Sequence, residues 1–473
     1  MTDVLRIDYV LPDAQSVAKG RRRRAPVPSL TMALLMAQTP KQINGAPVEA
    51  SVHVESMMGA YDVSKRRPDI LGLSFLTTGA PRAYQILREA RDCRAHSGGK
   101  IKTLVGGIHP SSLPQEALQC TETVVCGETP PELQHEVLTW LAGQGNGDIE
   151  PRVFRLGEMQ RHDVLVRPCP DFSWMRPKDY MVPQVVQTSV GCPYNCSFCT
   201  ATRVYGSTMR PVAYDLLERD VVALGPGLVA IVDDNFLARR PYDHARKVCD
   251  ILGRHGRTWV AELTARDLHR DEELIPLFAR SGCMGVYIGI ENVRVKLAKG
   301  LYPEQYKELI ARCHEHGLLV LGAFVFGVDE NEDEGIYEET VAFGERIALD
   351  FAQFSVNTPE PGSADFETAA RAGIITDWNW EHYDGTYPVR LFKNISAEKM
   401  HEGIGNAYRW FYSMGSIRRR LTPIGSWRHL RAWPYNLYLG GTVRLWKRRR
   451  NFAQYQAKSQ DQPSPAVASM FAQ

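Results

Sequence analysis

The sequence predicts an α/β protein: an N-terminal doubly wound parallel sheet, then a partial (β/α)6 barrel, then a helical C-terminal region. Near-continuous apolar runs alternate with amphipathic helix patterns in the first third, as expected for buried parallel strands joined by helices. A second series of six strand–helix units begins near residue 181, which is typical of a parallel barrel. After about residue 390 the strand pattern ends.

The first region, residues 1–145, has the strand–helix repetition of an open parallel sheet. Its expected strands cover residues 5–10, 69–76, 102–107 and 124–128. A helix follows the second of these strands, because Ala83, Ile86, Leu87 and Ala90 have the spacing i, i+3, i+4, i+7. Another helix is expected over 131–143.

Residues 146–180 predict a linker, since they contain several prolines and little periodicity. The second series then occupies residues 181–390. Its expected strands cover 185–190, 227–236, 259–264, 285–291, 319–327 and 350–359. The active site of such a barrel lies at the carboxyl ends of its strands.

The last region, 391–473, is expected to be helical and basic, with a loose tail. From Gly403 to Gln460 there is no Asp or Glu, whereas Arg418–Arg420 and Arg448–Arg450 are basic runs interleaved with aromatics. Three interpretations stay open. The region is a bundle that closes the substrate cavity, a surface for anionic lipid, or a nucleic-acid surface that no fold signature supports.

The overall composition is that of an ordinary globular chain, with 44% hydrophobic and 23% charged residues and a net charge of +2. These values exclude a mostly disordered chain, and the balanced charge gives no reason to expect an acidic partner. The sequence has no apolar run long enough for a transmembrane helix, and its N-terminus lacks a secretory signal. We therefore expect a cytoplasmic protein, with the inner membrane face as a peripheral site.

Three of the ten cysteines form one cluster, Cys192, Cys196 and Cys199, in a Cys-x3-Cys-x2-Cys pattern directly after the first strand of the second series. Three soft thiolates on one loop suit an iron–sulfur cluster, which normally takes four. Three ligands leave one iron open, as a catalytic metal centre requires. The alternatives are a zinc knuckle completed from elsewhere, although no His follows at zinc-finger spacing, or coincidence.

This motif, with the aromatic Phe198 before its third cysteine, resembles that of the radical S-adenosylmethionine (SAM) superfamily. The resemblance implies that Cys192, Cys196 and Cys199 bind a [4Fe–4S] cluster whose open iron binds SAM. It also implies reductive cleavage of SAM to methionine and a 5′-deoxyadenosyl radical, which abstracts hydrogen from the substrate.

Further residues fit the same resemblance and are predicted to contact the cofactor. Asp233, Asp234 and Asn235 end the second strand of the series, where enzymes of the family usually bind the amino group of SAM. Glu262, with Arg266 just beyond it, lies where the ribose or methionine moiety is often bound. Without the cysteine motif, the Asp pair could equally be a helix cap.

The later strands add two weaker signals. Gly289 and Glu291 lie in a segment that resembles the Gly-rich strand of the family, whose backbone contacts the adenine of SAM. Residues 359–362 resemble the Pro-x-Pro-Gly turn of the family. Alternatively, Gly289 serves close packing and Glu291 is a surface acid.

The first region has its own resemblance, to cobalamin-binding domains. Ser74 and Leu76 look like the Ser-x-Leu motif, and Gly106 and Gly107 like the Gly-Gly motif. Small residues at adjacent strand ends open a crevice for a nucleotide tail. The Asp-x-His-x-x-Gly motif is absent from residues 1–150, so no histidine of that motif would bind cobalt from below. The alternative is a structural remnant without cobalamin.

Two neighbouring polar residues are less informative. His109 could line the cofactor crevice, but we favour a loop histidine that caps Ser111 or Ser112. Glu128 ends a strand and has no assigned role.

The combined resemblance predicts a cobalamin-dependent radical SAM enzyme that methylates an unactivated carbon of a small-molecule or lipid-like substrate. The second prediction is a cyclase, hydroxylase or rearrangement enzyme without methyl transfer, and a cobalamin carrier that has lost its activity ranks below both. The implied partners are the substrate, an electron donor such as flavodoxin or ferredoxin, and a membrane surface, whereas nucleic acid is not expected.

Overall fold

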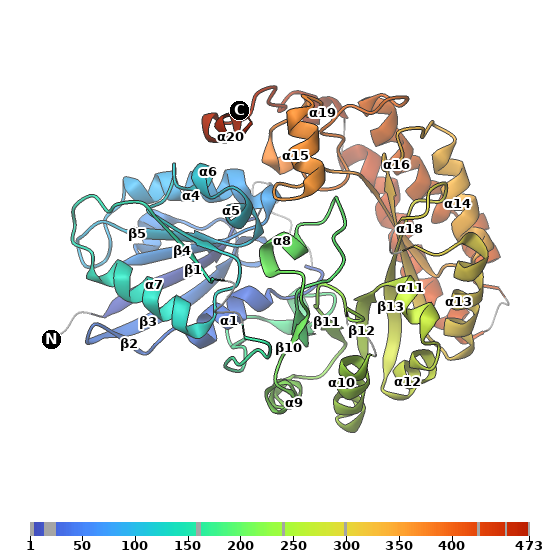
Figure 1. Cartoon of the computed structure of the whole chain (residues 1–473), viewed down its shortest axis with the longest axis horizontal. Helices are drawn as coiled ribbons and strands as arrows, with labels where there is room; N and C mark the ends of the chain where they lie inside the picture. The colour runs from blue at the N-terminus through green and yellow to red at the C-terminus, as the bar shows by residue number, and fades with distance from the viewer. Residues whose placement is uncertain are drawn as a thin grey trace.

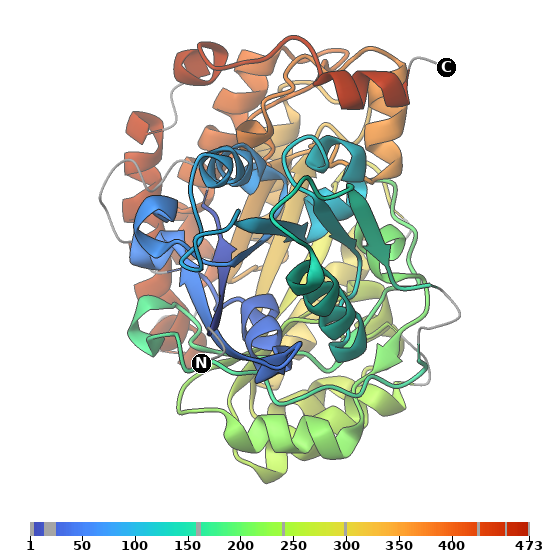
Figure 2. The same cartoon turned by 90° about the vertical axis from the view of Figure 1, so that its left-hand side faces the viewer.

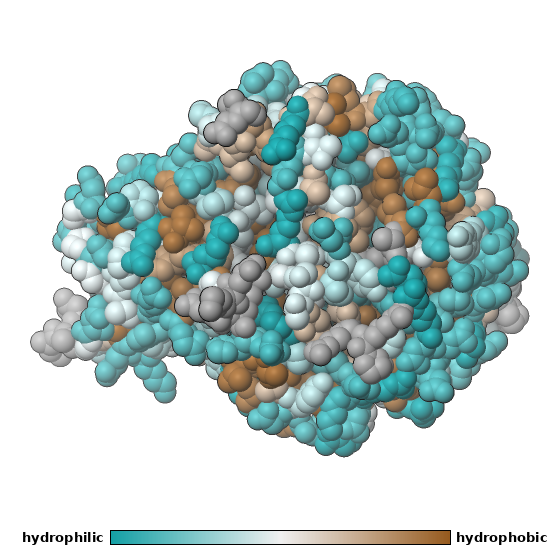
Figure 3. All heavy atoms as spheres, in the orientation of Figure 1, coloured by the Kyte–Doolittle hydropathy of each residue, from teal (hydrophilic) through white to brown (hydrophobic). Residues whose placement is uncertain are grey.

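The computed structural model describes residues 4–13, 25–157, 162–238, 242–297, 300–422, 426–449 and 452–471. Two mainly parallel sheets lie side by side, and α20 (Pro465–Met470) near the C-terminus returns over the first of them (Figure 1). Seen from its left-hand side, the molecule has the first sheet in front of the second (Figure 2). The face in Figure 3 is mainly hydrophilic, with hydrophobic side chains in separate groups. Among the described helices, none combines the length and apolar character that crossing a membrane requires.

The first sheet has the strand order β2-β3-β1-β4-β5-β6-β7 and is parallel except for the β2–β3 pair. Its strands are β1 (Leu5–Leu11), β2 (Gln42–Ile43), β3 (Ala46–Val54), β4 (Ile70–Ser74), β5 (Lys102–Gly106), β6 (Thr123–Cys126) and β7 (Arg152–Arg155). The chain order reverses between β1 and β4, and such a reversal is where open α/β sheets bind ligands. The predicted doubly wound sheet is thus confirmed.

Helices cover both faces of this sheet. They are α1 (Leu30–Gln38), α2 (Glu55–Met58), α3 (Val63–Arg66), α4 (Ala80–Arg91), α5 (Ile108–Ser112), α6 (Pro114–Ala117) and α7 (Pro131–Gly143). The predicted spacing on α4 is observed, since Ala83, Ile86, Leu87 and Ala90 are all buried.

The second sheet has the order β15-β14-β13-β12-β11-β8 and is parallel throughout. Its strands are β8 (Gln184–Val186), β11 (Val229–Ile231), β12 (Trp259–Leu263), β13 (Cys283–Glu291), β14 (Leu319–Phe326) and β15 (Phe351–Val356). Because β8 and β15 form its two ends, the barrel is partial, as predicted.

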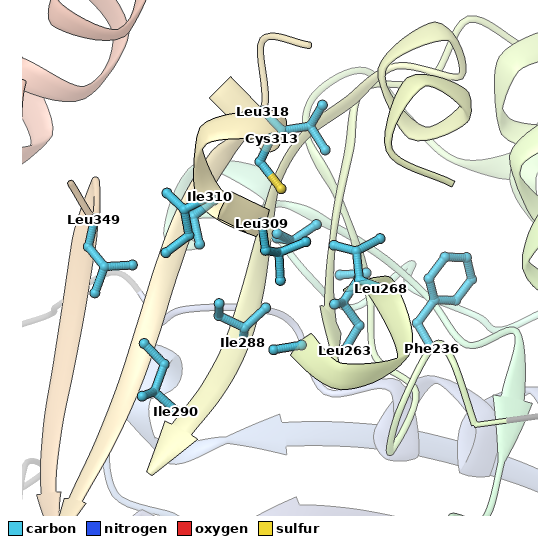
Figure 4. Close-up of a cluster of buried hydrophobic side chains, with 14 of the residues drawn as sticks. Phe236, Leu263, Leu268, Ile288, Ile290, Leu309, Ile310, Cys313, Leu318 and Leu349 are labelled. Atoms are coloured by element: carbon cyan, nitrogen blue, oxygen red, sulfur yellow. The ribbon is translucent and has the colours of Figure 1, made fainter. Parts of the chain in front are cut away.

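Helices pack on the outer side of the half-barrel. They are α9 (Tyr214–Ala223), α10 (Asp243–Arg254), α11 (Ala265–Arg270), α12 (Leu274–Arg280), α13 (Pro303–Glu315) and α14 (Ile336–Arg346), whereas α8 (Ala201–Tyr205) contacts α5 of the first domain. Figure 4 shows Leu309 and Ile310 of α13 beside Ile288 and Ile290 of β13, all four of them buried. The alternate residues of β13 therefore face the concave side.

The C-terminal part consists of α15 (Ala364–Arg371), α16 (Ala397–Phe411), α17 (Met414–Arg420), α18 (Trp427–Arg449), α19 (Phe452–Gln456) and α20 (Pro465–Met470). The final segment is not loose as expected. Val467 is fully buried in the core of the first domain, and the Ser464 hydroxyl donates to Glu116 at 2.8 Å. An apolar residue and a buried carboxylate thus hold this tail.

Asp350, just before β15, is a buried carboxylate that joins α18 to the half-barrel. It accepts two hydrogen bonds from the Arg428 guanidinium at 3.0 and 2.9 Å, and one from the Val320 N–H at 2.8 Å. The His314 ring lies 2.9 Å from its other oxygen. Loss of one partner of a buried ion pair leaves the other charge uncompensated.

We expect Asp350→Asn to lower the free energy of unfolding by about 3 kcal/mol, because Arg428 stays buried without its counter-charge. Urea unfolding measures the change. Asp333→Asn is the matched control, since Asp333 is exposed and pairs with Arg294, and we expect a loss below about 1 kcal/mol. Equal losses in the two variants would contradict this role of Asp350.

Candidate active site at the junction of the two sheets

The three predicted cluster ligands lie on one irregular loop after β9 (Ser189–Val190), at the carboxyl end of β8. Cys192 is buried, whereas Cys196 and Cys199 are half-buried. Gly191 enters the loop with φ +91°, and a Cβ there would lie 2.4 Å from the Thr208 carbonyl oxygen. Only glycine therefore allows this entry.

Hydrogen bonds fix the loop on several sides. The Gly191 N–H donates to the Asp234 carboxylate at 2.8 Å. The Thr202 hydroxyl lies 3.1 and 2.8 Å from the carbonyl oxygens of Cys192 and Tyr194. The Tyr194 hydroxyl donates to Asp267, a buried residue of α11. The thiols are thus presented by a preformed loop.

The donor set fits an iron–sulfur cluster, which this structure does not contain. Among the described residues, no three His, Cys, Asp or Glu side chains converge on one point as the ligands of a single ion would. Three thiolates that each bind a different iron need not converge, and thiolates are the usual ligands of such clusters. Cys192, Cys196 and Cys199 stay the predicted ligands, and Phe198 stays a predicted neighbour of the cofactor.

Asp233 is buried beside the loop, and its carboxylate is already engaged. It accepts hydrogen bonds from the Thr188 N–H at 2.6 Å, from the Thr188 hydroxyl, and from the Ser189 hydroxyl at 2.8 Å. Burial raises the pKa of Asp233 to about 6, against the lowering effect of these bonds. Asp233 and Asp234 therefore shape the strand end, and their contact with SAM stays a prediction.

Asn235 supplies an observation that the sequence did not provide. Its side chain is buried, and its amide nitrogen has no hydrogen-bond partner among the described residues. A buried donor without an acceptor is costly. An anionic group such as the carboxylate of SAM would satisfy it, so these residues fit the expected cofactor.

A polar face lies on the concave side of β12 and β13. Glu262 is exposed and pairs in register with Tyr287, and Glu291 lies on the same face of β13. Burial, and then the charges of Glu262 and Glu291, raise the pKa of Tyr287. Gly289 lies between them, where a Cβ would meet the Glu291 carboxylate at 2.4 Å. The structure thus gathers three of the predicted residues, and adds Tyr287.

The other half of the site lies at the ends of β4 and β5, where the sequence predicts the cofactor crevice. Ser74 is buried, and Leu76 just beyond β4 is 59% exposed despite its apolar side chain. Gly107 has φ +99°, and a Cβ there would lie 2.7 Å from the Phe75 carbonyl oxygen. The Phe75 N–H donates to the Gly106 carbonyl at 3.2 Å. The two strand ends are thus joined by a backbone hydrogen bond, and Leu76 leaves an apolar side chain exposed beside them.

Residues 54–61, where the Asp-x-His-x-x-Gly motif would be expected, contain no histidine and are held by other contacts. Glu55 is buried, forms an ion pair with Arg82 at 2.8 Å and accepts from the Tyr61 N–H at 2.8 Å. His53, before this segment, has its ring nitrogen 2.8 Å from the Gly59 carbonyl. Residues 54–61 thus offer no histidine as a cobalt ligand, and their one acid is already paired.

His109 does not have the role that we favoured. It is fully buried, and its Nε2 lies 3.1 Å from the Glu116 carboxylate. Ser111 and Ser112 instead donate to the carbonyls of Gly107 and Ile108. The predicted cap is therefore wrong, because the ring packs inward against Trp380 at 5.2 Å between centroids.

The crevice and the thiol loop meet at one junction (Figure 1). Helix α5 after Gly107 contacts α8, which begins two residues after Cys199. Glu128, unassigned from the sequence, forms an ion pair with Arg210 at 2.6 Å across this junction. The Asp365 N–H of α15 donates to the Ser197 carbonyl of the thiol loop at 2.9 Å.

The turn over residues 359–362 closes the same junction. Its Gly362 has φ +89°, and a Cβ there would lie 2.4 Å from the Ser112 hydroxyl oxygen. Burial raises the pKa of Glu360 in this turn to about 7, against the lowering effect of a hydrogen bond with Thr77. Glu360 can therefore hold a proton near neutral pH, and sequence reasoning had not singled it out.

Two family models match the two halves of this junction. The model of the radical SAM superfamily matches residues 186–339, which include the three cysteines, and that of the B12 binding domain matches residues 45–135. The chain belongs to the radical SAM enzymes that carry a cobalamin-binding domain. This confirms the predicted class of enzyme and its cofactors, a [4Fe–4S] cluster, SAM and cobalamin.

Individual proteins support the same assignment. The chain is 27% identical over 367 residues to bacteriochlorophyllide d C-12(1)-methyltransferase of Chlorobaculum tepidum, covering 75% of this chain and 76% of that protein. It is 24% identical over 382 residues to the anaerobic magnesium-protoporphyrin IX monomethyl ester cyclase of Rubrivivax gelatinosus, covering 74% and 67%.

Among solved structures, the radical SAM methyltransferase TsrM of Kitasatospora setae, with tryptophan and a SAM analogue, has a similar fold. The TM-score is 0.63 at 17% identity, over 96% of this chain and 98% of TsrM.

We expect Cys199→Ala to abolish the visible absorbance of the cluster and the cleavage of SAM, because one iron loses its thiolate. Anaerobic reconstitution with absorbance and assay of 5′-deoxyadenosine tests this. Cys169→Ala, at a half-buried thiol outside the loop, should retain both signals. Retained activity in Cys199→Ala would refute the assignment.

Asp233 should make stability depend on pH. Its pKa of about 6 in the folded state lies above the usual value of about 3.9, so the folded state binds the extra proton. The resulting stabilisation, up to about 3 kcal/mol, is present below about pH 4 and lost as pH rises through about 6. Asn mimics the protonated form, so Asp233→Asn should lose this component in urea unfolding at several pH values. An unchanged pH profile in the variant would contradict it.

Proposed function

We propose that this radical SAM enzyme transfers a methyl group to an unactivated carbon of a small-molecule or lipid-like substrate. The observation that carries the proposal is the junction itself, where a cobalamin-type crevice and a three-thiol loop meet at the carboxyl ends of two parallel sheets. The methyltransferase relative from Chlorobaculum tepidum supports transfer to carbon. Flavodoxin or ferredoxin is the proposed class of electron donor.

When bound, the cluster and cobalamin supply one-electron cleavage of SAM and a transferable methyl group, which are chemistries that side chains lack. The chain's own part is to hold its two sites at a fixed separation. The ion pair of Arg210 with Glu128 and the bond from Asp365 to Ser197 serve this purpose. Such positioning shortens the path that a reactive substrate carbon must travel.

The walls of the junction divide into polar and apolar parts. Glu262, Tyr287 and Glu291 present hydrogen-bonding groups from the half-barrel, whereas Leu76 presents an apolar side chain from the crevice. Polar groups orient a cofactor or substrate, and apolar ones exclude water from a radical reaction. This division suits a substrate with both a polar and an apolar part.

Anaerobic turnover with SAM and dithionite tests the function. If the enzyme methylates carbon, each product molecule should accompany one S-adenosylhomocysteine and one 5′-deoxyadenosine, because one SAM gives its methyl group and another is cleaved. Wild type and Cys199→Ala are compared by mass spectrometry with methyl-deuterated SAM. The variant should lose 5′-deoxyadenosine and methylated product, and it should form at most one S-adenosylhomocysteine per bound cobalamin, because no substrate then takes up the methyl group.

A second candidate is a cyclase or related radical enzyme without methyl transfer. The relative from Rubrivivax gelatinosus favours it, since that protein is named a cyclase. Such an enzyme would form 5′-deoxyadenosine without S-adenosylhomocysteine, and a cobalamin carrier would form neither. The ratio of the two products therefore separates the three hypotheses.

A further inference from the structure

Helix α18 has an exposed side that is apolar and aromatic. Leu430, Tyr435, Leu437 and Tyr438 are 71%, 58%, 43% and 61% exposed. At 100° per residue they fall within one half of the helix, together with the exposed Pro434 and Gly441. A solvated helix normally carries charged residues on this side. We call this surface the α18 outer face.

The opposite half of α18 is packed against the half-barrel, which fixes the direction of the outer face. Arg428, Ala432 and Asn436, spaced by four residues, are buried. Asn436 donates to the Asp350 carbonyl at 3.1 Å, and Ala432 packs with Leu319 of β14. The outer face therefore cannot turn inward without breaking these contacts.

The charged residues of the sequence segment that contains α18 have one sign. No Asp or Glu occurs from Gly403 to Gln460, and the sequence continues after Tyr438 with the cations Arg444, Lys447 and 448–450. Of the described side chains, Arg431 is exposed on α18 itself and Arg418 is exposed on the neighbouring α17. Leucine and tyrosine next to several cations, on a helix too polar to span a membrane, suit an interfacial helix.

We propose that the α18 outer face binds the surface of a membrane that contains anionic lipid. The leucines and tyrosines enter the interface, where tyrosine's apolar ring and polar hydroxyl are both accommodated. The negative surface potential of the membrane attracts the basic residues, and each cation near the surface strengthens the binding. The proposal is independent of the chemistry at the junction.

A second copy of this chain fits the α18 outer face less well. In a two-fold dimer the same patch contacts itself, which would place the acid-free basic segment against its own copy. Like charges that face each other oppose association. Nucleic acid would match the charge but gives no reason for exposed Leu430 and Leu437, since it is bound by cations and stacking rings.

Flotation of the full-length protein with vesicles tests the proposal. Wild type should float with phosphatidylcholine vesicles that contain phosphatidylglycerol, and several-fold less with phosphatidylcholine alone. High salt should weaken this binding, because it screens the attraction. We expect the double variant Leu430→Ser/Tyr438→Ser to bind about tenfold more weakly, since two apolar side chains no longer leave water.

The matched control is Val222→Ser/Tyr302→Ser. It also replaces one aliphatic and one tyrosine side chain, 57% and 60% exposed, but at positions outside α18. It should bind like wild type, and circular dichroism should show both variants folded. The proposal is overturned if wild type binds both vesicle types equally or neither, or if the α18 variant still floats like wild type. It is also overturned if the α18 variant only converts a dimer to a monomer in sedimentation velocity. None of these readouts depends on SAM cleavage.

Discussion

The junction depends on one buried carboxylate, that of Glu116 in α6. It accepts hydrogen bonds from Tyr84 at 3.2 Å, from the Trp380 indole at 3.1 Å and from the Ser464 hydroxyl at 2.8 Å, and it faces His109. These partners come from four separate segments, two of which follow the half-barrel. Because a buried carboxylate that loses its partners is costly, the C-terminal segments are held on the first domain in one arrangement. The two sheets consequently keep their carboxyl ends together.

Once that arrangement is fixed, one glycine decides how closely the two halves approach. At Gly362 φ is positive, and a Cβ would lie 2.4 Å from the Ser112 hydroxyl oxygen of α5. The close contact of α5 with α8 brings the crevice to the thiol loop. Gly362 was visible in the sequence as part of a turn, but its close approach to Ser112 appears only when the two domains meet.

Most of the fold could be predicted because buried parallel strands leave a local apolar run. The three strands of the first sheet that were missed, β2, β3 and β7, lie at or next to its edges. Each carries exposed polar residues, such as Glu49 in β3 and Arg152 in β7, so no continuous apolar run marked them. The order of the tail was missed because it depends on Glu116, some 350 residues earlier, and no local pattern records such a contact.

The site residues divide in the same way, into those that a local sequence pattern predicts and those that only contacts between distant segments reveal. Cys192, Cys196 and Cys199 were found because their spacing is local. Tyr287 and the Glu128–Arg210 pair were not, because their significance appears only when strands align or domains meet. Glu360 belongs to the same group, since its proximity to Thr77 joins the end of one sheet to the end of the other.

The basic C-terminal region, for which the sequence left three interpretations open, separates into two populations of arginine. Arg420 and Arg428 are buried, and Arg420 donates to the carbonyls of Leu349 and Phe411 at 2.6 and 2.9 Å. Burial lowers the pKa of Arg420 to about 10, which still leaves it charged. These two residues account for part of the charge as internal structure. The exposed cations and the α18 outer face are not explained by packing, so a bundle on the half-barrel and a surface for lipid can be two sides of the same helix.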